Sequence, residues 1–159
     1  MTVIKDAQGI DNFWTHIDDD ALLPSGAITV SLKRWMRERD DLLRRDEAVG
    51  VRLAPSDAPE TLGEDLPALP LIVLDMAPFT DGRSFTQARI LRERLGFAGE
   101  LRALGDFLRD QIFFLGRVGV NAFEFPEGTD LADRLKAFKE FSVTYQAAVD
   151  TQEPLYRRR

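Results

Sequence analysis

One run of four apolar residues constrains the fold of this 159-residue chain more than any other feature. Leu71-Ile72-Val73-Leu74 lies between Pro70 and Asp75. A strand with apolar side chains on both faces is typical of the interior of a parallel sheet. The run therefore predicts a central parallel strand in an α/β protein.

Short β-rich segments alternate with segments of helical periodicity along the chain, which favours strand–helix units with right-handed crossovers. The predicted strands are residues 2–4, 27–32, 49–53, 71–74, 99–104 and 122–125. The predicted helices are residues 33–45, a weak helix within 56–68, 84–95 capped by Ser84, 107–117, and a last helix from 129 or 130 to about 148 that buries Phe141 and Tyr145. About five such units are too few for an eight-fold barrel. We therefore expect repeated strand–helix units forming a mostly parallel open sheet or a partial-barrel-like arc.

Length and composition indicate a single α/β domain over residues 1–150, followed by a flexible basic tail at 151–159. The formal charge of 21 − 27 = −6 argues against a general nucleic-acid or anionic-membrane binder. No segment approaches the roughly 20 apolar residues of a membrane span. The N-terminus lacks the basic and apolar regions of a signal peptide. We expect a cytoplasmic protein with neither nucleic acid nor membrane as a partner.

Several kinds of chemistry are excluded by the residues that are missing. The chain has no cysteine, which excludes thiol catalysis, disulfides and cysteine-ligated metal or iron–sulfur sites. Its single histidine, His16, excludes multi-histidine metal sites and is expected to be incidental. No G-x-G-x-x-G, Walker A or G-x-S-x-G motif is present. We therefore predict no cofactor and no metal.

Ligands bind at the carboxyl ends of strands in proteins of this class. The residues that the predicted elements place there, and that we take as the candidate binding site, are Asp81, Arg83, Ser84, Arg102, Asp106 and Glu124. Arg83 and free backbone N–H groups at a helix N-terminus would suit an oxyanion, and Arg102 would add a second cation. The alternative is an ion-pair lattice in which these arginines pair with Asp106, Asp110 or Glu124.

Two further possibilities follow from the same segments. Asp75, Asp106 and Glu124 could together bind magnesium or act as general acid and base, although nothing in their spacing requires it. An open sheet leaves edges that need covering, and the adjacent Phe113 and Phe114 point to different sides of one helix. A homodimer is therefore one expected partner arrangement.

Several motifs resemble a known family. They are VGVRLAP at 49–55, FTDGRSFTQARILRER at 79–94, GELRALGD at 99–106, RDQ at 109–111, RVG at 117–119, AFE at 122–124 and FSVTYQ at 141–146. Together they resemble the proteobacterial family called domain of unknown function 934. The family is described as an oxidoreductase of sulfite reduction, because its genes lie beside those for sulfite reductase and sulfate activation.

The resemblance implies a pathway but no catalytic residue. Because the chain lacks cysteine and a dinucleotide motif, an accessory protein that acts with sulfite reductase fits better than a free-standing oxidoreductase. On this hypothesis Arg83 and Arg102 would hold an oxyanion such as sulfite or sulfate. The alternative is a small enzyme that uses carboxylates and arginines at the strand ends, with magnesium as an option. The third alternative is a structural interaction module.

Each alternative predicts a different structural feature. An enzyme predicts a concave pocket where Asp75, Arg102 and Glu124 converge. An accessory protein predicts an exposed apolar patch on a helix face. A structural module predicts that internal ion pairs consume those polar residues.

Overall fold

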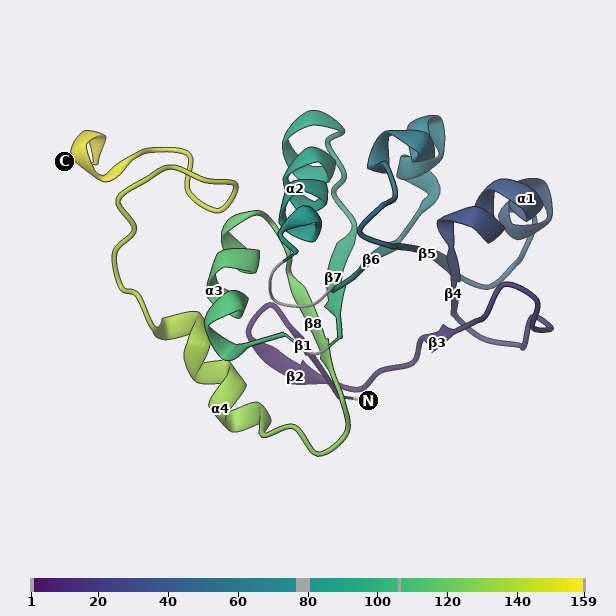
Figure 1. Ribbon diagram of the computed structural model, residues 1–159, viewed down its shortest axis with the longest axis horizontal. Helices are drawn as coiled ribbons and strands as arrows, with labels where there is room; N and C mark the ends of the chain where they lie inside the picture. Colours follow the sequence, from purple (N-terminus) through teal and green to yellow (C-terminus); the bar gives the residue numbers. More distant parts are fainter. Residues whose placement is uncertain (1, 77–80, 106, 159) are drawn as a thin grey trace.

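The computed structural model describes residues 2–76, 81–105 and 107–158. Within these residues, eight strands form one sheet in the order β2-β1-β8-β7-β6-β5-β4-β3, and the sheet curls into a half-barrel (Figure 1). The strands are β1 (Thr2–Lys5), β2 (Gln8–Ile10), β3 (Thr15–His16), β4 (Ile28–Ser31), β5 (Val49–Leu53), β6 (Leu71–Asp75), β7 (Glu100–Leu104) and β8 (Ala122–Phe125).

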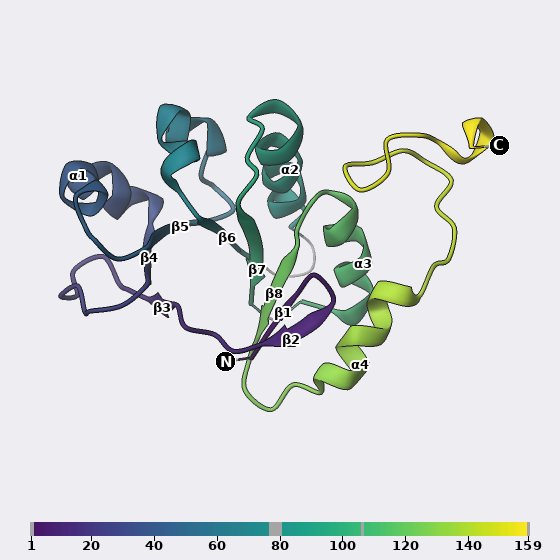
Figure 2. The same ribbon diagram turned by 180° about the vertical axis from the view of Figure 1, so that it is seen from behind.

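Helices lie along the convex outside of this half-barrel, as the front and back views show (Figures 1 and 2). They are α1 (Leu32–Leu43), α2 (Arg83–Arg89), α3 (Arg109–Arg117) and α4 (Leu131–Lys136), with a π-helical continuation of α2 at Ile90–Arg94 and 3₁₀ segments at Pro59–Ala68, Ala137–Lys139 and Leu155–Arg157. The segment between β5 and β6, predicted as a weak α-helix, is thus 3₁₀, with Gly63 at positive φ between its turns.

The sheet is mostly parallel. Strands β3 to β8 run in the same direction, and only β1 pairs antiparallel, with β8 on one side and β2 on the other. β6 is central, because β5 and β7 pair along its two sides. Its four apolar residues, Leu71 to Leu74, are fully buried. The predicted open, mostly parallel sheet is confirmed.

The two faces of the sheet carry separate cores. The larger core lies between the convex face and the helices and includes Ile72, Leu101 and Phe123. A smaller core lies on the concave face, where Trp14 packs with Leu71 and Val73. Alternation along a strand sends neighbouring side chains to opposite faces, so one strand serves both cores.

The link at residues 11–14 supplies the cover for the concave face. It joins β2 at one edge of the sheet to β3 at the other. The steps from Ile10 to Thr15 can span at most roughly 18 Å. The curl of the sheet must therefore bring its two edges within that distance, and Trp14 lies across the interior between them.

The C-terminal helix is much shorter than the sequence indicated. α4 and its 3₁₀ continuation end at Lys139, and no helix is assigned from there to Pro154. The prediction of a helix to about residue 148 was wrong. Ser142, Val143 and Thr144 explain the difference, because β-branched residues and serine have weak helix propensity. Phe141 and Tyr145, predicted to be buried, are exposed.

Candidate functional site

A buried ion pair occupies the concave interior of the half-barrel. Arg102 lies on β7 between Leu101 and Ala103, which face the convex core, so alternation turns Arg102 inward. Glu124 is turned inward in the same way on β8. Arg102 Nη1 donates to Glu124 Oε2 at 2.8 Å, and the side chains are 1% and 0% exposed. The structure thus brings these two predicted site residues into direct contact.

Other polar side chains complete the surroundings of Arg102. Glu100 accepts from Arg102 Nε at 2.8 Å and from Nη2 at 2.5 Å, and its second oxygen pairs with Lys5 at 2.8 Å. Asn12 accepts from Arg102 Nη1 at 3.0 Å and donates to Glu124 Oε1 at 2.8 Å. The protein's own carboxylates therefore neutralise this guanidinium, as the ion-pair alternative predicts.

His16 is the last member of this cluster. Its Nε2 lies 3.1 Å from Glu124 Oε1, and its Nδ1 lies 2.6 Å from Thr29 Oγ1. Burial alone would raise the pKa of Glu124, but the hydrogen bonds from His16 and Arg102 outweigh burial and hold that pKa below its ordinary value. His16 is on β3 and Glu124 on β8, so their contact crosses the interior of the curled sheet.

A second pair of charged side chains lies nearer the carboxyl ends of the strands. Arg52 on β5 pairs in register with Val73, which places Asp75 two residues further along the neighbouring strand on the same face. Arg52 Nη2 donates to the backbone carbonyl of Ile17 at 2.9 Å, while its buried Nε has no hydrogen-bond partner. Among the described residues, the Asp75 carboxylate has no hydrogen bond or ion pair. Burial raises the pKa of Asp75, and the charges of Arg52 and His16 offset part of that effect.

The loop at residues 81–84, predicted to bind an oxyanion, holds an ion pair of its own. Arg83 Nη2 pairs with Asp81 at 2.6 Å, Arg83 Nε donates to both oxygens of the same carboxylate, and the pair is exposed. These bonds lower the pKa of Asp81 to about 2. Ser84, predicted as the helix cap, lies inside the first turn of α2, and its Oγ donates to the Asp75 carbonyl at 3.2 Å. Asp106 lies outside the described residues.

The predicted site residues thus divide into two groups. Arg102 and Glu124 meet inside the half-barrel, Asp81 and Arg83 meet on the outer loop, and no hydrogen bond or ion pair joins the two pairs in the part of the chain that the structure describes. Sequence reasoning missed other members of the interior cluster, which are Lys5, Asn12, His16, Thr29 and Glu100. Charged residues inside apolar strands were a usable signal for Arg52 and Glu100. Nothing in residues 2–23 indicated that Asn12 and His16 turn inward.

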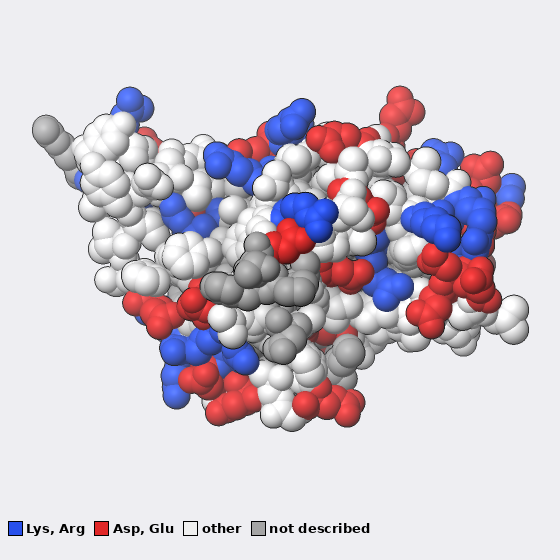
Figure 3. All heavy atoms as spheres, in the orientation of Figure 1, with Lys and Arg blue, Asp and Glu red and all other residues white. Residues whose placement is uncertain are grey.

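An aromatic groove lies on the outside of the molecule, between α3 and the segment that follows α4. It is defined here by Phe113, Phe114, Phe141, Val143 and Tyr145, and its volume is about 600 Å³. Phe113 contacts Phe114 and Phe141, with ring centroids 5.4 and 4.6 Å apart. Except for Phe113, each of these side chains is more than half exposed. Figure 3 shows that most of the surface over this C-terminal segment is uncharged.

Arginines of the C-terminal tail lie beside this groove. Arg158 Nη2 donates to the carbonyl of Thr144 at 2.9 Å, and Leu155 N–H donates to the carbonyl of Tyr145. Arg157 lies over the ring of Tyr156. Neither Arg157 nor Arg158 forms an ion pair with a carboxylate of the described chain. The groove therefore combines exposed rings with unpaired positive charge.

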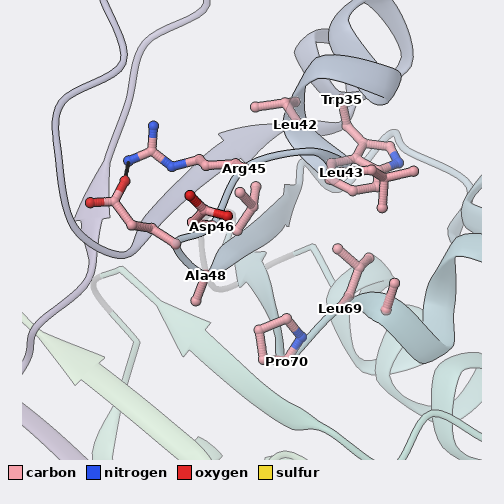
Figure 4. A pocket seen from close by; sticks show the side chains of 11 residues that line it. Trp35, Leu42, Leu43, Arg45, Asp46, Ala48, Leu69 and Pro70 are labelled. Atoms are coloured by element: carbon pink, nitrogen blue, oxygen red, sulfur yellow. Dashed lines mark ion pairs between the residues drawn. The ribbon is translucent and has the colours of Figure 1, made fainter.

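A different pocket, of about 390 Å³, opens at the amino ends of β5 and β6 (Figure 4). Trp35, Leu42 and Leu69 line it, and Arg45 forms an ion pair with Glu47 at its side. Arg45 also donates to two backbone carbonyls. This pocket is at the opposite end of the strands from Asp75, and we place no chemistry in it.

No group of three or more metal-ligating side chains is gathered in the described part of the chain. No helix among the described residues is long and apolar enough to cross a membrane.

Comparison with known proteins gives one family. The family model described as bacterial protein of unknown function (DUF934) matches residues 50–156. This range contains β6 to β8 and all of β5 except Val49, and it includes Arg52, Asp75, Arg102 and Glu124. No curated protein matches the chain. Because the match covers more than half of the sequence, the chain belongs to the DUF934 family of bacterial proteins of unknown function.

Proposed function

We propose that this protein is an accessory factor of assimilatory sulfite reduction that docks on sulfite reductase through the aromatic groove. The observation that carries the proposal is the groove itself. A monomeric protein rarely exposes neighbouring large apolar side chains unless they bind a partner, and aromatic residues are enriched at protein interfaces. Sulfite reductase is the partner that the family resemblance implies.

The charges around the groove indicate what its partner presents. Arg157 and Arg158 lie beside exposed rings and have no carboxylate partner in the described chain. Arginine and aromatic side chains dominate the binding energy of many interfaces. We therefore expect the docking face of sulfite reductase to present acidic residues around an apolar centre.

The oxyanion part of the hypothesis has weaker support at its expected position. Arg102 is surrounded by Glu100, Glu124 and Asn12, and Arg83 is occupied by Asp81. An anion would have to displace these carboxylates. Oxyanion binding at Arg83 and Arg102 is therefore a proposal separate from docking on sulfite reductase. It requires its own measurement of sulfite or sulfate binding.

The test of docking is direct binding of purified sulfite reductase to the full chain. We expect complex formation, and we expect Phe114→Ser to weaken it at least about tenfold, because a central aromatic side chain is a typical hot spot. Leu22→Ser is the matched control, since Leu22 is 94% exposed and lies outside the groove. Absence of binding by the wild-type chain, or equal weakening by both variants, would overturn the proposal.

The alternative function is a small enzyme that acts through carboxylates and arginines at the strand ends. One observation favours it: Asp75 is a partly buried carboxylate near Arg52, its burial raises its pKa, and perturbed acids of this kind gather at catalytic sites. This alternative predicts that Asp75→Asn abolishes an activity while leaving sulfite reductase binding unchanged.

A further inference from the structure

The structure contains an unpartnered donor and an unpartnered acceptor side by side at the carboxyl ends of β5 and β6. The donor is Nε of Arg52, which is buried and unpaired. The acceptor is the Asp75 carboxylate, which has no hydrogen bond within the described chain. Their strands are paired, and both residues belong to the concave face. Buried polar groups are normally satisfied, so the unpaired Nε of Arg52, close to a partly buried carboxylate without a partner in the described chain, requires an explanation.

Arg52 differs from the other arginines that share this feature. Arg45 and Arg109 also have a buried Nε without a hydrogen bond, but both form ion pairs. Arg45 pairs with Glu47, and Arg109 pairs with both Asp133 and Glu140. Arg52 forms no ion pair with any described carboxylate. Its one hydrogen bond within the described chain, from Nη2 to the Ile17 carbonyl, fixes the guanidinium and leaves Nε without a partner.

The other charged groups around this place are already engaged. Asp19 accepts from Ser31 Oγ at 2.5 Å, and Asp57 accepts from the Ala54 N–H at 2.8 Å. His16 is bonded to Glu124 and Thr29. What remains for a ligand is one guanidinium edge and one carboxylate.

We propose that Arg52 and Asp75 form a binding site for a small oxyanion that carries a proton of its own. Arginine suits an oxyanion because its planar guanidinium donates from adjacent nitrogens. A carboxylate beside it repels a fully deprotonated oxyanion but accepts a hydrogen bond from one that retains a proton. Asp75 would thus select for the protonated form, and Arg52 would supply the charge.

Two inorganic probes separate this site from general anion binding. Near neutral pH, inorganic phosphate carries at least one proton and sulfate carries none, although their sizes and shapes are similar. Titration calorimetry of the full chain should show phosphate binding at millimolar concentration and sulfate binding at least about tenfold weaker, because sulfate leaves Asp75 facing an unpaired negative oxygen. Failure to bind phosphate, or equal binding of both anions, would overturn the proposal.

Variants assign the binding to these side chains. Arg52→Met should weaken phosphate binding at least tenfold, whereas Arg44→Met, at an exposed arginine that is already paired with Asp41, should leave it unchanged. Asp75→Asn should reduce the difference in affinity between phosphate and sulfate, because the asparagine amide can donate a hydrogen bond to sulfate as well. This variant keeps the test decisive if Arg52→Met folds poorly. Unchanged selectivity in a folded Asp75→Asn protein would contradict the assignment, and none of these outcomes depends on docking at the aromatic groove.

Discussion

At the scale of single residues, the stability of the fold depends on the buried ion pair between Arg102 and Glu124. Removing one member of such a pair leaves the other charge unpaired in the interior. We predict that Arg102→Met lowers the free energy of unfolding by about 3–5 kcal/mol, measured by urea denaturation. The double variant Arg102→Met with Glu124→Gln should recover part of this loss. A double variant that is less stable than the single one would show that the charge is not the cause.

Asp75 should behave in the opposite way. Because burial raises its pKa, the ionised carboxylate costs stability above the folded-state pKa, and the cost disappears as the pH falls through that value towards the unfolded-state pKa. We predict that Asp75→Asn raises the free energy of unfolding near neutral pH, because the amide carries no charge. Thermal unfolding at neutral and acidic pH checks this, and the gain should shrink in acid. A gain that is independent of pH would argue against an ionised Asp75.

The pKa of Glu124 is shifted in the opposite direction to that of Asp75. It is lowered, so its contribution to stability is complete above the unfolded-state pKa and is lost as the pH falls through the folded-state value. Two inward-facing carboxyls of one sheet thus respond oppositely to acid. The difference arises from partners: Glu124 accepts bonds from Arg102, Asn12 and His16, whereas Asp75 accepts none from the described residues.

At the scale of elements, the link between β2 and β3 is the cover of the half-barrel. Trp14 is 8% exposed and packs on Leu71 and Val73. We predict that Trp14→Ala costs about 3–5 kcal/mol in urea unfolding followed by circular dichroism, because it opens a cavity over the concave face. Phe13→Ala is the matched control, since Phe13 is 69% exposed and should change stability little. Similar losses in both variants would mean that the link does not cover the interior.

The strands of the parallel sheet were largely predictable from sequence. β5 and β8 begin and end at the predicted residues, because each is a short β-rich run bounded by turn residues. The β2 strand and the crossing link were not predictable, since their position depends on long-range contacts such as Asn12 with Glu124. The C-terminal helix failed for a related reason. The apolar spacing is that of a helix, but the side chains of Phe141 and Tyr145 are exposed and line the aromatic groove instead of packing in the core.

The candidate site was predictable only in part. The carboxyl-end rule named Asp75 among the residues at the strand ends, and it placed Arg102 and Glu124 near each other in the sheet. It gave no indication that Arg102 would be surrounded by carboxylates, because Glu100 and Asn12 reach it only after the strands alternate and the link crosses. Arg52 was overlooked although a charged residue inside the apolar run at 49–53 was a usable signal.

At the scale of the whole molecule, the curl of the sheet brings the residues of the interior cluster together. A flat sheet would separate β3 from β8 by the four strands that lie between them. In this molecule, His16 and Glu124 on those strands are 3.1 Å apart. The curl also buries Trp14 against the central strand. Interior polar contacts, the apolar cover and the strand-end pair of Arg52 and Asp75 therefore depend on one another through the shape of the sheet.

The outer surface predicts the oligomeric state of the free protein. The edge strands β2 and β3 have three and two residues, which is too short to pair well with a second sheet. If the aromatic groove is reserved for sulfite reductase, the free protein should sediment as an 18.0 kDa monomer at micromolar concentration, and Phe114→Ser should not change that mass. A wild-type dimer that Phe114→Ser converts to monomer would show that a second copy of the chain occupies the groove. Sedimentation velocity of the two proteins therefore decides between self-association and docking, since only docking leaves the groove open in the free protein.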